Sequence, residues 1–301
     1  MLAAWLAVAA GCGAERSSAP TASTGGFPVR VNAANGEVRI PARPERIVSL
    51  SPTATETLFA IGAGPQVVAV DSRSSHPPDA PRTELSGLNP NIEAVAAYKP
   101  DLVVYASDPV ELGESLDSLG VPRLLQPPAG DLADAYSQIR ELGVATGHSL
   151  QAADLVERVE QSIERSVRSL PHFTRPLTYY HEVDQSYFTA TSRTFIGQIY
   201  GLLGLRNIAD GADRLGNGYP QLSAEFIIEA NPDLIFLADA RCCGQSAETL
   251  RQRPAWGQIA AVANGAVIPL DDDLASRWGP RVGDLVESVA GALRAAAPNL
   301  Q

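Results

Sequence analysis

Short apolar runs alternate with stretches of helical spacing along most of the chain. The apolar runs occupy residues 46–50, 66–70, 101–105, 122–126, 177–181, 234–237 and 266–270. Runs of this length, rich in β-branched residues, are typical of strands buried on both faces of a parallel sheet. The stretches of helical spacing include residues 110–119, 194–203, 224–230, 256–262 and 282–296. This alternation predicts an α/β fold with mostly parallel sheets.

One helical stretch, residues 149–170, is much longer than the others. Its apolar side chains recur every three or four positions, at Ala152, Val156, Val159, Ile163, Val167 and Leu170. Such spacing forms one apolar stripe on a helix, and Pro171 ends the helix. At about 1.5 Å per residue, a helix of this length spans roughly 33 Å. We therefore predict two Rossmann-like lobes, residues 37–147 and 172–301, bridged by one long helix within residues 148–171.

One sequence motif occurs twice, which indicates that the two lobes are similar. Residues 93–104 contain a glutamate, a short apolar helical turn, Pro-Asp-Leu and an apolar run, and residues 225–236 repeat this order. Pro100 and Pro232 lack a backbone N–H, so each should end a helix before a buried strand begins. Helix followed by strand is half of a βαβ unit, and we expect one such half in each lobe.

A helix-capping pattern follows the first apolar run. Thr53 and Glu56 have the spacing of a capping box, in which each side chain bonds the backbone N–H of the other residue. We therefore expect Glu56 to serve the start of a helix that ends near Gly62.

The first residues differ from the rest of the chain. Residues 1–10 are apolar or small and lead into Gly11-Cys12. A segment this short cannot span a bilayer core of ~30 Å, but it suits the hydrophobic part of a secretion signal. Residues 9–12 resemble a bacterial lipobox, which implies a signal peptide at 1–12, lipidation of Cys12, and a flexible tether and leader at 13–36. A soluble secreted protein is the alternative.

Composition and charge narrow the classes of partner. The chain is 45% hydrophobic and 19% charged, as expected for a folded protein, and its formal charge is −11. An acidic protein lacks the basic surface that phosphate backbones require, so we expect no nucleic-acid partner. Beyond Cys12 there are only Cys242 and Cys243. Two thiols are too few for a structural zinc site, and adjacent cysteines form a disulfide only with a distorted peptide, so we expect a small-residue loop there.

Candidate binding residues follow the predicted strands, because ligands of open α/β sheets bind beyond the carboxyl ends of the strands. If the lobes face each other, these residues line one cleft that mixes cationic, acidic and aromatic side chains. The candidates are Ser51, Arg73, Tyr105, His181, Glu182, Tyr187, Asp273, Arg277 and Trp278.

Two other functions stay open at this point. His181, Glu182 and Asp184 form a cluster that contains a general base and an orienting acid, as a chelatase-like or hydrolytic enzyme would need. No nucleophile elbow, phosphate loop or zinc-protease motif accompanies the cluster, so we expect no catalytic residues. A receptor for a naked metal ion would need three or four ligands, yet His148 and His172 flank the long helix at opposite ends. We expect no protein-held metal.

Taken together, these residues resemble the helical-backbone, or class III, periplasmic substrate-binding proteins of ABC importers for ferric siderophores, haem and cobalamin. The similarity runs from about Arg43 to the end of the chain. The motifs that carry it are residues 46–52 with Glu56, residues 99–102, Phe195-Ile196-Gly197, residues 231–234, and Gly279-Pro280-Arg281.

The resemblance implies a lipoprotein that captures a metal chelate between its lobes and delivers it to a membrane permease with its ATPase. Glu93 and Glu225 match the glutamates that dock onto arginine pockets of the permease. No cofactor is implied, since the metal arrives within the ligand. We expect a monomer, exported and either lipid-anchored to the outer face of the cell membrane or periplasmic.

The cobalamin-binding members look most similar within this family. Tyr219 stands where they have a ligand-stacking tryptophan, and Asp273 with Arg277 falls on matching positions. Leu88, Ala106 and Glu182 instead replace aromatic residues. A ferric siderophore or haem therefore remains an alternative ligand, which arginines would bind through anionic groups. The candidates are Arg73, Arg193, Arg241 and Arg277.

Overall fold

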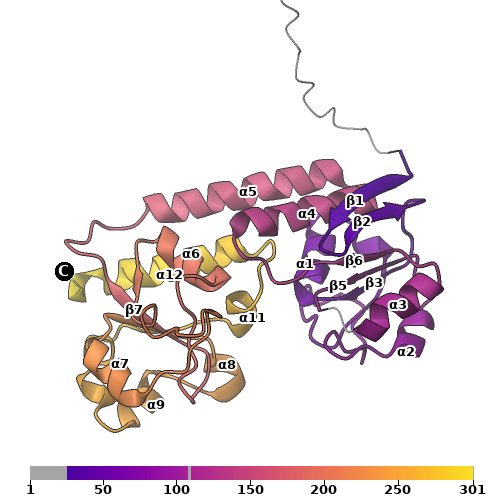
Figure 1. Ribbon diagram of the computed structural model, residues 1–301. Coiled ribbons are helices and arrows are strands. Elements are labelled where there is room, and N and C mark those ends of the chain that lie inside the picture. Colours follow the sequence, from indigo (N-terminus) through magenta and orange to yellow (C-terminus); the bar gives the residue numbers. More distant parts are fainter. Residues whose placement is uncertain (1–25, 108–109, 301) are drawn as a thin grey trace, which may run out of the picture.

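The protein folds as two α/β lobes beneath one long helix, as the computed structural model of residues 26–107 and 110–300 shows (Figure 1). Each lobe contains a four-stranded sheet in which all paired strands are parallel. The N-terminal sheet consists of β3 (Ile47–Leu50), β4 (Val67–Val70), β5 (Leu102–Tyr105) and β6 (Arg123–Leu125). The C-terminal sheet consists of β7 (Thr178–Glu182), β8 (Arg206–Asn207), β9 (Leu234–Leu237) and β10 (Val267–Pro269).

The two sheets have the same strand order, which confirms the prediction of similar lobes. The order is β4-β3-β5-β6 in the first lobe and, read from the corresponding edge, β8-β7-β9-β10 in the second. In each sheet the second strand of the chain precedes the first, and the third and fourth follow it. An α/β fold with parallel sheets, as predicted from the apolar runs, is therefore confirmed.

The repeated Pro-Asp-Leu motif has the same local structure in both lobes. Before each proline, Lys99 and Asn231 adopt left-handed backbone angles, with φ of 49° and 45°, and so end the preceding helix. The aspartate then holds the start of the adjacent strand. Asp101 accepts the N–H groups of Glu45 and Arg46 before β3, and Asp233 accepts that of Thr178 at the start of β7.

Helices cover both faces of each sheet, so the strands are buried. The first lobe contains α1 (Pro52–Ala60), η1 (Gly64–Gln66), α2 (Ile92–Ala96), α3 (Val110–Ser118) and α4 (Leu132–Thr146). The second contains α6 (Phe195–Leu202), α7 (Ala224–Ala230), α8 (Ala240–Cys243), α9 (Ala247–Gln252), η2 (Trp256–Gln258), α10 (Ala260–Ala263), α11 (Asp272–Ala275), α12 (Val282–Ala296) and η3 (Ala297–Asn299). The predicted helix at 256–262 is thus two short helical turns rather than one helix.

The long helix α5 (Ser149–Arg168) joins the lobes by packing on a helix of each (Figure 1). Its buried stripe includes Val156, Val159 and Ile163, as the sequence spacing predicted, and it contacts α4 on one side and α12 on the other. Gly143 of α4 lets the helices approach closely, because a Cβ there would lie 2.4 Å from the Cβ of Ala152.

Near the start of the first lobe, the structure adds a hairpin and corrects one expectation. Residues 13–36 were expected to be a flexible tether and leader, and the described end of this segment belongs to β1 (Val29–Ala33) and β2 (Gly36–Ile40), an antiparallel hairpin whose Val31 and Ile40 are buried. The predicted capping box is absent, because Ser51 is the N-cap of α1 and accepts the N–H of Ala54. The signal peptide, Cys12 and the first part of the tether lie outside the described residues. Within the described part of the chain, none of the helices has the length and apolar character needed to cross a membrane.

Candidate functional site

A cavity of about 380 Å³ lies between the two lobes. The first lobe contributes the loop at 128–130, and the second contributes residues 193–196, 216–219 and 275–278. Phe195, Tyr219 and Trp278 supply aromatic surface, and Arg193 and Arg277 supply guanidinium groups. The Trp278 indole donates a hydrogen bond of 2.9 Å to the Gln138 side chain of the first lobe. Flat apolar surfaces with a few fixed polar groups are typical of small-molecule sites.

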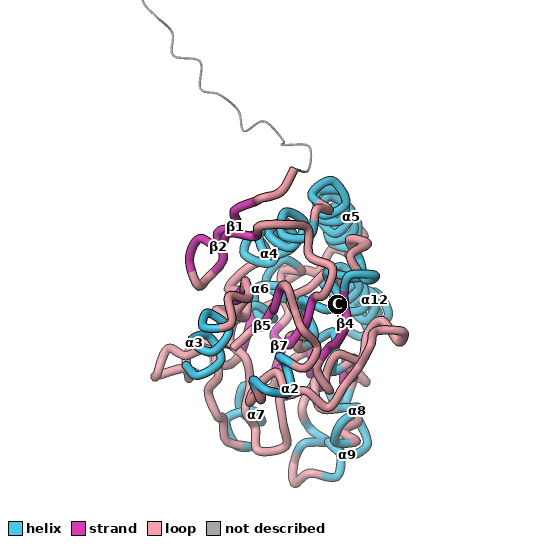
Figure 2. Tube along the Cα trace, turned by 90° about the vertical axis from the view of Figure 1, so that its right-hand side faces the viewer, coloured by secondary structure: helices cyan, strands magenta, loops and turns pink. Residues whose placement is uncertain are grey.

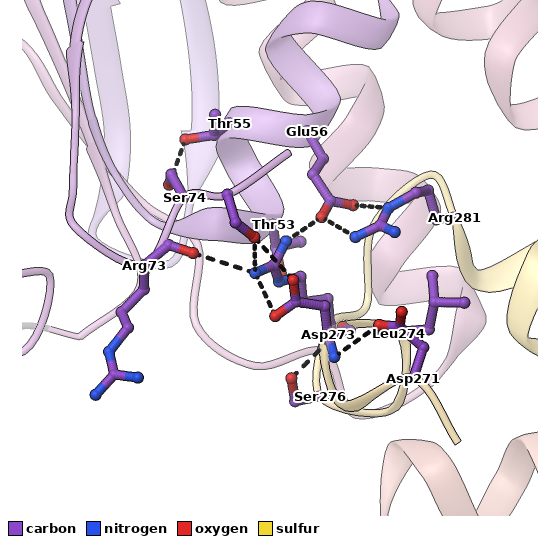
Figure 3. Close-up of polar contacts among 12 residues, drawn as sticks. Thr53, Thr55, Glu56, Arg73, Ser74, Asp271, Asp273, Leu274, Ser276 and Arg281 are labelled. Atoms are coloured by element: carbon purple, nitrogen blue, oxygen red, sulfur yellow. Dashed lines mark hydrogen bonds and ion pairs between the residues drawn. The ribbon is translucent and has the colours of Figure 1, made fainter. Parts of the chain in front are cut away.

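Ion pairs join the two lobes (Figure 3). Glu56 of α1 pairs with Arg277 and with Arg281, and Arg281 Nε lies 2.9 Å from Glu56 Oε2. The Glu56 and Arg277 side chains are only 1% and 7% exposed. Hydrogen bonds to Glu56 raise the pKa of Arg281. Removing one partner of such a buried pair costs about 3–5 kcal/mol, because the other charge stays buried without compensation.

Arg277 also contacts the loop that follows β4. Its Nη2 atom lies 3.1 Å from the Arg73 carbonyl oxygen, 3.1 Å from Ser75 Oγ and 2.7 Å from Asp273 Oδ1. Ser75 in turn donates to the other carboxylate oxygen of Asp273 at 2.8 Å. We call the set Glu56, Ser75, Asp273, Arg277 and Arg281 the inter-lobe latch. Since Arg277 also lines the cavity, the latch and the cavity share one side chain.

Three of the predicted binding residues, Tyr219, Arg277 and Trp278, line the cavity. Tyr219 is half exposed, and burial of the rest raises the pKa of its hydroxyl. Asp273 lies beside the cavity as a partner of Arg277. Arg73 reaches the latch only through its backbone carbonyl, and its exposed side chain points away from the ion pairs (Figure 3).

The structure does not bring the other predicted binding residues to the cavity. Ser51, Tyr105, His181 and Glu182 are buried in the folded lobes, so no ligand reaches them in this conformation. Tyr105 accepts a hydrogen bond from Arg123, and Ser51 caps α1. Placing these four at the cleft surface was wrong, because Tyr105, His181 and Glu182 lie within buried strands and Ser51 caps α1.

The buried His181 and Glu182 belong to separate clusters. His181 Nδ1 lies 2.9 Å from the Tyr200 hydroxyl, and burial lowers its pKa to about 4, which keeps the ring neutral. Glu182 makes a two-pronged ion pair of 2.6 Å with Arg253. Tyr187 stacks on Trp256 beside the same arginine rather than in the cavity. The imidazole and the carboxylate therefore do not form the acid–base arrangement that an enzyme would need.

Asp239 adds an unusual carboxyl group near Glu182. It follows β9, is 1% exposed, and neither of its oxygens has a hydrogen-bond partner among the described residues. Burial, with repulsion from Glu182, raises its pKa to about 7. Among residues 26–107 and 110–300, no three His, Cys, Asp or Glu side chains are grouped in a way that would hold a metal ion.

The two predicted docking glutamates occupy equivalent positions in the two lobes. Glu93 is the second residue of α2, which Asn91 caps, and Glu225 is the second residue of α7, which Ser223 caps. Both side chains are exposed. Hydrogen bonds from its own backbone N–H and from Ser223 lower the pKa of Glu225. Figure 1 and Figure 2 both show α2 and α7 on the side of the molecule away from α5.

Sequence reasoning missed several residues of this site. The loop at 128–130 and Phe195 line the cavity, although the loop follows the predicted strand 122–126 by only two residues and was not among the candidates. Glu56 was assigned to a helix cap, whereas it binds two arginines of the other lobe. The motif Phe195-Ile196-Gly197 could have indicated that Phe195 belongs to the site. A Cβ at Gly197 would lie 1.9 Å from the Thr191 carbonyl oxygen, so this glycine shapes the turn that presents Phe195.

Comparison with known proteins relates the chain to transport proteins. A family model described as periplasmic binding protein matches residues 47–274. An uncharacterized ABC transporter substrate-binding lipoprotein of Bacillus subtilis is 30% identical over 294 residues, covering 93% of this chain and 91% of the relative.

Two solved structures with a similar fold are of proteins whose ligands are known. The periplasmic haem-binding protein of Roseiflexus sp. RS-1 superposes with a TM-score of 0.74 at 26% identity, covering 84% of this chain and 99% of that one. The periplasmic vitamin B12-binding protein of Vibrio cholerae superposes with a TM-score of 0.68 at 27% identity, covering 85% and 98%.

Proposed function

The chain belongs to the periplasmic binding protein family, and from this premise we propose that the cavity between its lobes captures a metal chelate. It is a substrate-binding protein of an ABC transporter, not an enzyme, and it works with a membrane permease and an ATPase. One observation carries the proposal. Three aromatic residues and two arginines of the second lobe line one cavity of about 380 Å³ between the lobes.

The lining suits a chelate with flat apolar faces and polar edges, of the cobalamin, haem or ferric siderophore type. Tyr219 and Trp278 offer faces for stacking, and Arg193 offers an exposed guanidinium at the rim. Guanidinium groups bind carboxylates through paired, charge-assisted hydrogen bonds. The metal then enters as part of the ligand, and the protein needs no cofactor of its own.

Fluorescence titration with cyanocobalamin, haemin and several ferric siderophores tests this proposal. We expect saturable quenching by one of these ligands, without turnover. Trp278→Phe should lose most of the signal, because Trp278 lines the cavity while Trp256 is fully buried. Equilibrium dialysis that detects no binding of any of the three ligand classes would contradict the proposal.

A single arginine distinguishes an anionic chelate from cobalamin. Arg193 lines the cavity and its side chain is 58% exposed beside Asp213. If the ligand carries carboxylates there, Arg193→Ala should weaken binding by about tenfold or more, the value of a hydrogen bond to a charged group. Binding of cyanocobalamin unchanged by Arg193→Ala would instead favour the cobalamin assignment. Arg206→Ala, at an exposed arginine outside the cavity lining, is the matched control.

Delivery to the permease rests on Glu93 and Glu225 in this proposal. Two exposed carboxylates on separate lobes, each in the first turn of a short capped helix, suit two arginine pockets of one membrane partner. We further propose that Cys12 carries a lipid anchor and that the protein is a monomer. The family and the lipoprotein relative indicate an exported or membrane-anchored protein.

A further inference from the structure

The adjacent cysteines Cys242 and Cys243 form a disulfide at the end of the short helix α8. Both residues are exposed, as are their neighbours Arg241 and Gly244. Disulfides persist in exported proteins, and an exposed one is open to attack by a thiolate. The sequence favoured a small-residue loop at this place and left the redox state of the two cysteines open. The disulfide is not part of the site described above.

Two carboxylates of α11 and its cap hold the disulfide-bearing helix. The backbone N–H groups of Arg241 and Cys242 donate to the two oxygens of Asp272, at 3.1 and 2.7 Å. The Arg241 guanidinium pairs with Asp271. Figure 1 shows α8 beside α11 on the part of the second lobe that faces the first.

The next residue along the chain, Asp273, belongs to the inter-lobe latch. Its carboxylate accepts from Ser75 of the first lobe at 2.8 Å and pairs with Arg277 at 2.7 Å. Three consecutive aspartates therefore connect α8 to the latch: the first two hold α8, and the third holds the other lobe. Contiguous contacts of this kind are the physical route by which one site affects another.

We propose that Cys242–Cys243 is a redox-active modification site that regulates the inter-lobe latch and, through Arg277, the cavity. The regulation of ligand binding rests on the proposed function, whereas the effect on the latch does not. A low-molecular-weight thiol is the reductant. Its thiolate attacks one sulfur, breaks the S–S bond and forms a mixed disulfide; a second thiol then releases the oxidised reductant. The protein gains two electrons and two protons as two thiols.

The mechanism follows from the covalent ring. A disulfide between adjacent residues closes a small ring that contains their peptide bond, and this ring restricts the backbone that directs the Cys242 N–H to Asp272. Reduction opens the ring, so the contact with Asp272 loses its preset geometry and α11 becomes less constrained. Asp273 then holds Ser75 and Arg277 less firmly.

Hydrogen–deuterium exchange of the ligand-free full chain, before and after dithiothreitol, tests the proposal. Intact mass should increase by two hydrogen atoms. Exchange should become at least about threefold faster in peptides covering 240–245 and 271–278, because local opening becomes more frequent. A Cys242→Ser/Cys243→Ser variant should behave like the reduced protein and not respond to dithiothreitol.

Two outcomes would overturn the proposal: no mass change on reduction, or equal exchange of 271–278 in the oxidised and reduced proteins. Asp272→Asn is the matched control. It should leave the reduction-dependent change at 240–245 but abolish that at 271–278, since the carboxylate linking α8 to α11 is lost. Because no ligand is present, these results do not depend on which chelate binds. Chelate affinity measured in both redox states then tests the regulatory step separately.

Discussion

At the scale of single residues, the unusual feature is one carboxylate that holds two arginines of the opposite lobe. Glu56 is almost fully buried and pairs with both Arg277 and Arg281, and Arg277 also pairs with Asp273. A buried ion pair adds little net stability compared with apolar residues, but losing one member is costly. Glu56 therefore fixes how the lobes meet.

Glu56→Gln should lower the free energy of unfolding by about 3–5 kcal/mol, because Arg281 loses its paired carboxylate and the buried Arg277 keeps only its pair with Asp273 among the ion pairs of the described residues. Urea unfolding followed by circular dichroism measures this change. The control is Glu164→Gln on α5, whose pair with Arg168 is 65% and 67% exposed. That variant should change stability by less than about 1 kcal/mol. Equal effects of the two variants would contradict the role assigned to Glu56.

Asp239 should give the protein a pH-dependent stability near neutrality. Its pKa is about 7 in the folded chain against 3.8 for an ordinary aspartate, so the folded state holds this proton more tightly. The stabilisation of the folded state by the protonated Asp239 carboxyl group is fully present below about pH 3.8 and is lost as pH rises toward 7. Burial is the largest cause of this raised pKa; the charges of Glu182 and Asp184 raise it further, and the charge of Arg253 lowers it.

Asp239→Asn isolates this effect, because His181 titrates in an overlapping range with the opposite sign. The stability of the variant relative to the wild type should increase from pH 5 to pH 8 when both are unfolded with urea. His181 contributes equally to both proteins and cancels. A stability difference that does not vary with pH would show that Asp239 is ionised throughout.

At the scale of elements, the bridging helix depends on close contact with its neighbours. Gly143 of α4 faces Ala152 of α5 with no space for a Cβ, so backbone contact replaces side-chain packing there. The same α5 stripe contacts α12 of the second lobe, and Ser166 of α5 donates to Glu287 at 2.7 Å. The helix thus links the lobes by packing on both.

Gly143→Ala should destabilise the protein by about 1–3 kcal/mol, the usual cost of overpacking. Gly291→Ala in α12 is the matched control, since its Cβ would meet only the end of the Arg294 side chain at 3.5 Å. Alanine is favoured over glycine in helices by about 1 kcal/mol, so this control should be stabilising. Thermal and urea unfolding measure both. Stabilisation of both variants would contradict the close helix contact.

The sequence predicts those elements that are determined by residues close together in the chain. The strands, α5 and the repeated turn were predicted because apolar periodicity and proline act over a few residues. The two-residue strand β8 was missed because it depends on pairing with the distant β7. The hairpin β1–β2 was missed although its strands pair locally, because its buried face is defined by packing against the distant α4. The capping box was assigned wrongly because Thr53 and Glu56 match the pattern, while Ser51 occupies the cap.

At the scale of the whole molecule, two similar lobes present similar surfaces on one side. The helices α2 and α7 carry Glu93 and Glu225 at the same helical position, on the side away from α5 (Figure 1). Because α5 packs on both lobes, the distance between the two carboxylates depends on how the two lobes are oriented relative to each other. A membrane partner that binds both therefore senses that orientation.

The double variant Glu93→Ala/Glu225→Ala should abolish binding to the permease and ligand uptake, while chelate affinity stays within about twofold of the wild type, since neither glutamate lines the cavity. Uptake assays and fluorescence titration measure the two properties separately. Glu114→Ala/Glu229→Ala, one exposed glutamate from each lobe, is the control and should retain uptake. Loss of chelate affinity in the docking variant would refute the assignment.

The sequence by itself determined the two-lobed α/β fold, the bridging helix, the duplication and the transporter family, because these depend on periodicity and short motifs. Only the tertiary structure decided which polar residues meet. Glu56 finds Arg277, 221 residues further along the chain. His181 and Glu182 follow the pattern of a strand end but are buried, because helices cover both faces of the sheet. A side chain's neighbours across the lobes are set by packing, which local patterns do not contain.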